Sequence, residues 1–242
     1  MGDYLAAEKH ADWGMATYDP DRDHRLTYIF TGHDPDFSAL MLWIRGYPDQ
    51  ALQRGREGMS LAERESHSVT IALAQSTLAF VHLLRREPEA GLEWAQLQLD
   101  VASKYDLPLL AGTARFCFGW ALAQQRELQD GIREMRKAVE GIAATGAEAG
   151  MNFYLCVLAH AYGELGDASE GLTLLEKAFG IIAKSGTRHL LPELLRTKGE
   201  LLSRLHAQDD AVEGWFRQSL MAARSESTKL PELRAATSLA RL

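Results

Sequence analysis

The sequence predicts an all-α fold, a right-handed superhelix (α-solenoid) of antiparallel helix pairs with a period of 40 residues. The first observation is a small residue that recurs at this interval where one helix ends and the next begins: Ala51, Gly91, Gly131, Gly171 and Ala211. The second is another small residue that lies 12 positions earlier in each repeat: Ala39, Ala79, Gly119, Ala159 and Gly199. The third is that no segment shows the alternating, β-branched pattern of a strand.

Turn signals divide the chain into successive helices. An amphipathic helix over residues 3–17 ends at Tyr18-Asp19-Pro20, because proline cannot extend a helix. Asp34 is a candidate N-cap, with Pro35 in the first helical turn. Beyond it the pattern predicts helices over 35–45, 49–65, 68–85, 89–104, 108–125, 129–145, 148–164, 168–184, 188–205, 209–224 and 230–242.

The repeats predict one helical domain over residues 1–242, with about five helix pairs and a partial repeat at each end. Segment 3–17 has the pattern of a second helix without its first, and 230–242 has that of a first helix without its second. Because a complete array normally ends in polar capping faces, we expect this sequence to be part of a longer chain.

The two small residues of a repeat fall on the two helices of one pair, where they allow the backbones to approach closely. Large apolar residues, Leu78, Phe118 and Leu158, precede the first small residue in three repeats. This pattern resembles the tetratricopeptide repeat, whose usual period is 34 residues. The additional residues here fall at the end of the second helix and the entry to the next. In the fifth repeat, Phe216 and Ser219 fit the pattern only if one residue has been added within 205–210.

Composition limits the classes of partner. The chain has 242 residues and a net charge of −7, an acidic balance that argues against nucleic acid or an anionic membrane as the main partner. Cys117 and Cys156 lack a CxxC or Cys/His context, so we expect two small core residues rather than a disulfide or metal pair. No secretory signal or membrane-spanning run is evident, and we expect a cytoplasmic location.

Several phrases occur in a particular order along the chain. They are Tyr18-Asp19-Pro20, Gly32-His33-Asp34-Pro35, Gly46-Tyr47-Pro48-Asp49, Thr145-Gly146-Ala147-Glu148, Leu158-Ala159-His160-Ala161-Tyr162-Gly163, Lys198-Gly199-Glu200-Leu201-Leu202 and Phe216-Arg217-Gln218-Ser219-Leu220. This order resembles the C-terminal helical-repeat region of bacterial adenylate/guanylate cyclase-like and related ATPase-type signalling proteins. The resemblance implies a region that binds partners or regulates, while a separate cyclase module carries the chemistry.

Motifs for catalysis or cofactor binding are absent from the sequence. It has no phosphate-binding GxxxxGKS/T, no HExxH and no nucleophile elbow, and its eight histidines are scattered. We therefore expect no catalytic residues, no metal site, no cofactor and no enzymatic activity.

A surface is the stronger candidate for function, because first helices line the concave face of such arrays. The positions next to the small column and one turn before it give a candidate partner-binding groove: Phe80, Phe116, Trp120, His160, Arg196 and Glu200. The alternative is that the aromatic residues belong to the core, since an aromatic stripe at helical spacing is often buried. Likewise Glu164, Arg196, Glu200 and Arg204 could form a solvated charged face.

Two classes of function follow. The first is a non-catalytic scaffold that binds a protein or peptide partner, with an apolar anchor and a charged tail, and regulates a signalling protein. The second is a module that senses a small ligand or self-associates and regulates an attached cyclase or ATPase. Neither involves nucleic acid or a membrane.

Overall fold

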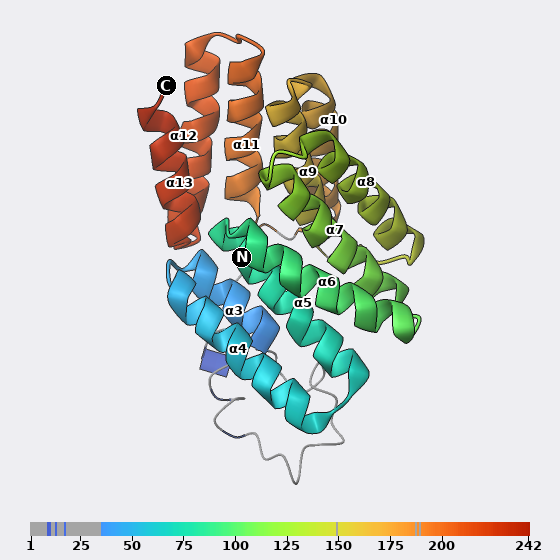
Figure 1. The fold of residues 1–242 in the computed structure, drawn as a ribbon. Coiled ribbons are helices and arrows are strands. Elements are labelled where there is room, and N and C mark those ends of the chain that lie inside the picture. The colour runs from blue at the N-terminus through green and yellow to red at the C-terminus, as the bar shows by residue number, and fades with distance from the viewer. Residues whose placement is uncertain are drawn as a thin grey trace.

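The computed structural model describes residues 35–148, 150–186, 188 and 190–242, together with Lys9, His10, Trp13 and Thr17. The described part holds eleven helices (Figure 1): α3 (Pro35–Ile44), α4 (Pro48–Glu65), α5 (Ser68–Arg85), α6 (Pro88–Lys104), α7 (Pro108–Gln124), α8 (Leu128–Ala144), α9 (Met151–Leu165), α10 (Ala168–Ser185), α11 (Leu191–Arg204), α12 (Asp209–Ser225) and α13 (Lys229–Ala240). None of the described residues is in a strand. The predicted all-α fold is confirmed.

The helix ends follow local sequence rules. Pro48, Pro88 and Pro108 occupy the first turns of α4, α6 and α7, where the missing N–H costs no hydrogen bond. At the start of α10, Asp167 accepts a hydrogen bond from the backbone N–H of Glu170 at 3.1 Å. Gly166 ends α9 with a φ of 92°, a left-handed conformation that glycine adopts without steric cost.

The expected and observed helix bounds differ most at the starts of α9 and α11, by three residues each. In the first case Gly150 takes a left-handed φ of 77°, and the helix begins only after it. In the second, Pro192 fixes the first turn of α11. The helix expected over residues 3–17 lies outside the described residues, apart from four isolated positions.

The helices pack as antiparallel pairs, α3/α4, α5/α6, α7/α8, α9/α10 and α11/α12, and α13 follows as an unpaired first helix. First helices also contact the first helix of a neighbouring pair, as α3 does with α5 and α11 with α13. The array curves so far that α13 returns to contact α3 (Figure 1). There Leu230 packs against the buried cluster of Met41, Trp43 and Ile44.

Small residues set the spacing within pairs, as their periodicity suggests. A Cβ atom added to Gly119 would lie 2.7 Å from the carbonyl oxygen of Gly131, so α7 and α8 touch backbone to backbone. A Cβ on Gly171 would likewise lie 2.7 Å from the carbonyl oxygen of Ala159. Gly199 differs, because the space beside it is filled by the ring of Phe216.

The remaining small positions contribute in other ways. Ala39, Ala51, Ala79 and Ala159 are fully buried, whereas Ala211 is exposed. Gly91 makes room for the Trp120 ring, which would lie 3.3 Å from an added Cβ. In the fifth pair, the buried side chain of Val212 takes the place that Ala211 was expected to fill. This shift agrees with the additional residue inferred between 205 and 210.

Candidate functional site

The first helices converge on a central cavity of about 90 Å³, to which α3, α5, α7, α9, α11 and α13 all contribute. Its apolar wall includes Trp43, Trp120 and Phe153, and its polar residues include His160, Glu193, Thr197 and three arginines, Arg86, Arg196 and Arg234. The inner surface of the curved array is therefore a site built from segments far apart in the sequence.

For two of the predicted groove residues the burial agrees with the alternative that they belong to the core. Phe116 is completely buried and packs edge-to-face on Tyr154, with ring centroids 4.8 Å apart. Trp120 is only 7% exposed and lies over Gly91. The helices pack tightly enough for these rings to fill the space between repeats, so both are core residues. Phe80 is half-buried against Phe153 and Tyr154.

The charged predicted residues lie together, but they differ in exposure: Glu164 and Arg204 are exposed, Glu200 is half-buried and Arg196 is buried. Arg196 is 5% exposed and donates two hydrogen bonds to Glu193 Oε2, at 3.2 Å from Nε and 3.0 Å from Nη2. Its Nη1 donates to Glu200 Oε1. Ser238 of α13 also donates to that oxygen, at 3.2 Å, which connects α13 to the network.

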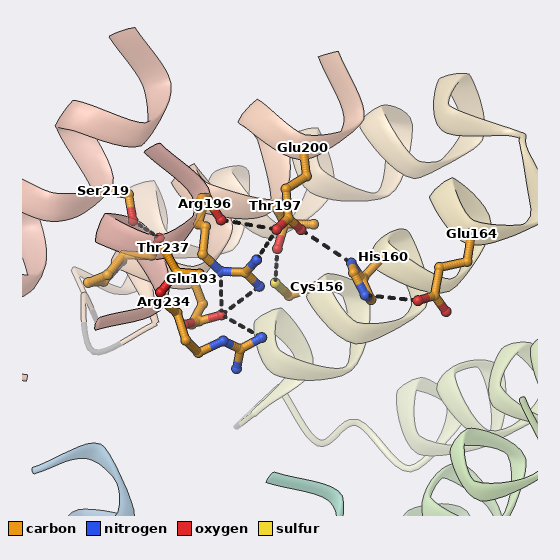
Figure 2. Close-up of polar contacts among 12 residues, drawn as sticks. Cys156, His160, Glu164, Glu193, Arg196, Thr197, Glu200, Ser219, Arg234 and Thr237 are labelled. Carbon is orange, nitrogen blue, oxygen red and sulfur yellow. Dashed lines mark hydrogen bonds and ion pairs between the residues drawn. The ribbon is translucent and has the colours of Figure 1, made fainter. Parts of the chain in front are cut away.

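His160 lies between two carboxylates (Figure 2). Its Nε2 is 3.4 Å from Glu164 Oε1 and its Nδ1 is 3.4 Å from Glu200 Oε2. Burial lowers the pKa of His160, but the hydrogen bonds with Glu164 and Glu200 outweigh burial and raise it above its ordinary 6.5. Folding thus favours the imidazolium form more than the unfolded chain does.

The pKa values of the carboxylates Glu193 and Glu200 are lowered. Burial opposes ionisation of Glu200, yet the hydrogen bond with His160 and the charge of Arg196 lower its pKa to about 2. Burial likewise opposes ionisation of Glu193, and the charges of Arg196 and Arg234 lower its pKa. Both groups therefore carry full negative charge at neutral pH. The network is a set of opposite charges that offset one another, with Glu193 and Arg196 buried and the others half-buried.

Two open hollows adjoin the cavity. One, of about 580 Å³, lies between α13 and the end of α5, and Arg86, Arg196 and Arg234 line both it and the cavity. The other, of about 380 Å³, is lined by His160, Glu164, Glu200, Arg204 and Arg241, among others. Within the described part of the chain, Arg86, Arg204 and Arg241 form no ion pair.

The sequence did not identify three residues that line the cavity, Glu193, Arg234 and Arg86. The spacing of Glu193, Arg196 and Glu200 could have identified Glu193, since residues three and four apart lie on one face of a helix. Arg234 gives no such signal, because it reaches Glu193, at 3.4 Å, only through the return of α13 to the first repeats.

The cysteines are not set up for chemistry. Cys117 and Cys156 are free and buried. Burial raises the pKa of both thiols, that of Cys156 to about 11, so both remain protonated at neutral pH. Cys156 lies 3.5 Å from the hydroxyl of Thr197, as a small polar contact within the core.

The sequence was compared with protein families and with known proteins. None of the protein-family models searched matches the sequence. A protein of Rhizobium meliloti, described as uncharacterized, is 27% identical over 237 residues; the match covers 95% of this chain, which spans 23% of the length of that protein.

Solved structures give the same architecture. The crystal structure of a single-substitution form of a putative kinesin light chain with nearly identical TPR-like repeats, from Podosopora anserina, matches with a TM-score of 0.52 and 14% identity, over 88% of this chain and 99% of that one. The form without that substitution matches with a TM-score of 0.50 and 15% identity, over 87% and 98%. The described helices therefore form a tetratricopeptide-like repeat solenoid.

Proposed function

We propose that this chain is a non-catalytic scaffold that binds an acidic segment of a protein partner on its concave face and regulates a longer bacterial signalling protein. The observation that carries the proposal is the group of arginines without ion pairs around the two hollows, Arg86, Arg204 and Arg241. Their positive charge stands out in a chain whose net charge is −7. It gives one face of the molecule a local attraction for anionic groups.

The same face offers contacts for an apolar anchor. Leu233, which lines the larger hollow, is 61% exposed, and Leu242, which lines the smaller one, is 47% exposed. Arginine beside exposed leucine suits a peptide with an apolar residue next to acidic ones. Carboxylates interleave with the arginines, as Glu87, Glu164 and Glu200 do, which favours a peptide over a nucleic-acid backbone.

The relative in Rhizobium meliloti supports a longer parent protein, since a similar sequence occurs there within a protein about four times as long as the matched region. The resemblance to cyclase-associated repeats favours an attached cyclase or ATPase as the regulated enzyme. A cytoplasmic location suits this role. Among the described residues, α5 is the one helix long and apolar enough to cross a membrane, and 61% of it is buried, as in a soluble core helix.

Substitution by glutamate of arginines that line the two hollows tests the proposal. The protein is incubated with an array of peptides that combine one leucine or phenylalanine with acidic, neutral or basic neighbours, and affinities are measured by fluorescence anisotropy. We expect acidic peptides to bind, and Arg204→Glu and Arg241→Glu to weaken them about tenfold or more. Added salt should also weaken them, because these charges are exposed.

Arg133→Glu is the matched control, since Arg133 is also an exposed arginine but lies on the outer helix α8. It should leave peptide affinity unchanged. Equal binding of neutral and acidic peptides, or equal effects of all three substitutions, would refute the proposal. Trp120 and Arg196 are unsuitable for this test, because both are buried and their removal changes folding as well.

A further inference from the structure

Glu193, which lines the central cavity, has a carboxylate oxygen without a hydrogen-bond partner among the described residues. Glu193 is 9% exposed, and its Oε2 atom receives both hydrogen bonds from Arg196 and the ion pair with Arg234. Its Oε1 atom is buried and has no hydrogen-bond partner. Because a buried unpaired carboxylate oxygen is costly, it indicates a donor that completes the site.

The same cavity contains donors in excess. Arg234 makes one ion pair, at 3.4 Å, although its guanidinium carries five N–H donors. Arg86 forms no ion pair within the described part of the chain and lines the cavity as well. Burial lowers the pKa of Arg234, and the neighbouring charges of Arg196 and Arg86 lower it further, which outweighs the attraction of Glu193. An anionic group beside these two arginines would relieve that repulsion.

The remaining wall is apolar. Trp43 and Trp120 line the cavity with Leu40, Ile44 and Leu83. Its volume of about 90 Å³ compares with the roughly 150 Å³ cavity that holds a benzene molecule, so the apolar part of an occupant is limited to about three or four carbon atoms. Groups larger than this would extend into the adjoining hollow, which shares Trp43, Arg86 and Arg234 with the cavity.

We infer that the cavity binds a small zwitterion of the α-amino acid class. Its ammonium group donates to Oε1 of Glu193, its carboxylate contacts Arg86 and Arg234, and its short apolar side chain lies among Trp43, Trp120 and Leu40. A zwitterion suits the site because it supplies both a donor for Glu193 and an anion for Arg86 and Arg234, whereas Arg196 is already held by Glu193 and Glu200. This small-molecule site goes beyond the proposed peptide contact; the two share Arg86, and they are told apart by Arg204 and Arg241, which do not line the cavity.

Calorimetric titration of the full chain with alanine, valine, proline and leucine tests the inference. At least one of these amino acids should bind. Its amide, which lacks the carboxylate, and its deaminated acid, which lacks the ammonium, should each bind at least about tenfold more weakly, since each loses one charge-assisted contact. The inference is overturned if none of the four binds at millimolar concentration, or if the two analogues bind as well as the parent.

Variants locate the site. Arg86→Ala should weaken binding about tenfold or more without loss of folding, because Arg86 is exposed and forms no ion pair among the described residues. Val157→Phe, which places a ring in the cavity wall, should abolish binding while circular dichroism stays helical. Arg204→Ala is the matched control, since Arg204 lines the outer hollow but not the cavity.

Retained binding in both Arg86→Ala and Val157→Phe would exclude the cavity as the site. Failure of the acidic-peptide experiment would leave these results unaffected, because Arg204 and Arg241 do not line the cavity. Conversely, loss of peptide binding on Arg241→Glu with unchanged amino-acid binding would show two separate sites.

Discussion

Gly119 of α7 and Gly131 of α8 lie in backbone contact. A Cβ atom on Gly131 would come within 2.4 Å of the carbonyl oxygen of Gly119, and within 2.5 Å of the backbone nitrogen of Ala123. No flexible side chain is available to yield at either place, so the two helices would have to move apart.

Gly131→Ala should therefore lower the free energy of unfolding by about 3 kcal/mol, at the upper end of the usual overpacking cost. Urea denaturation followed by circular dichroism measures it. Gly141→Ala is the control on the same helix: an added Cβ there has no neighbour within 4 Å. Alanine should stabilise α8 at that position by about 0.5–1 kcal/mol. A similar change in both variants would contradict the close contact.

Arg196→Met should destabilise the protein by about 3 kcal/mol, because it leaves the buried Glu193 and the half-buried Glu200 without their common cation. Arg133→Met removes an exposed ion pair, with Asp130, and should change the free energy of unfolding by less than about 0.5 kcal/mol. The two variants can be compared by chemical denaturation. Equal free energies of unfolding for the two variants would mean that water screens the charges around Arg196 as well as it screens the exposed pair.

His160 should make stability depend on pH. Its pKa is raised in the folded state, so its contribution is present below the unfolded value of about 6.5 and is lost as pH rises through the folded value. We expect the wild type to lose its advantage over His160→Gln between mildly acidic and mildly alkaline pH. Urea denaturation across this range measures it, and an NMR titration of the imidazole gives the pKa directly. Parallel stability curves would be inconsistent with the expected role of His160.

Phe116→Ala should cost about 3–5 kcal/mol of stability, as expected for a large ring removed from a tightly packed interior. Phe80→Ala should cost less, because Phe80 is only half-buried. Thermal denaturation of the two variants distinguishes a core residue from one on a groove wall. A smaller loss for Phe116 than for Phe80 would reverse the assignment.

The fold was accessible from the sequence because its determinants are local and periodic. Gly131 and Gly171 recur with the repeat, Pro88 and Pro108 mark helix starts, and the helix bounds follow from them. The shift in the fifth pair was also visible, since Phe216 departs from the register, and the structure places its ring beside Gly199.

The site was less accessible, because it depends on the curvature of the whole array. Periodicity identified His160, Arg196 and Glu200 as neighbours on one surface, but not that Arg196 is buried. It also could not distinguish a core ring from a groove ring at Phe116, since both have the same helical spacing. The position of Arg234 beside Glu193 depends on α13 lying against the first repeats, a contact between residues far apart in the chain.

The contact between α13 and α3 joins the first and the last described helices of the solenoid. In an open solenoid each repeat is stabilised only by its immediate neighbours, so damage at one end fades along the array. Here the first and last described helices share an interface, at which Leu230 packs on Met41 and Trp43. Removal of α13 should therefore also destabilise α3, and removal of α3 should destabilise α13, although the two helices are far apart in the sequence.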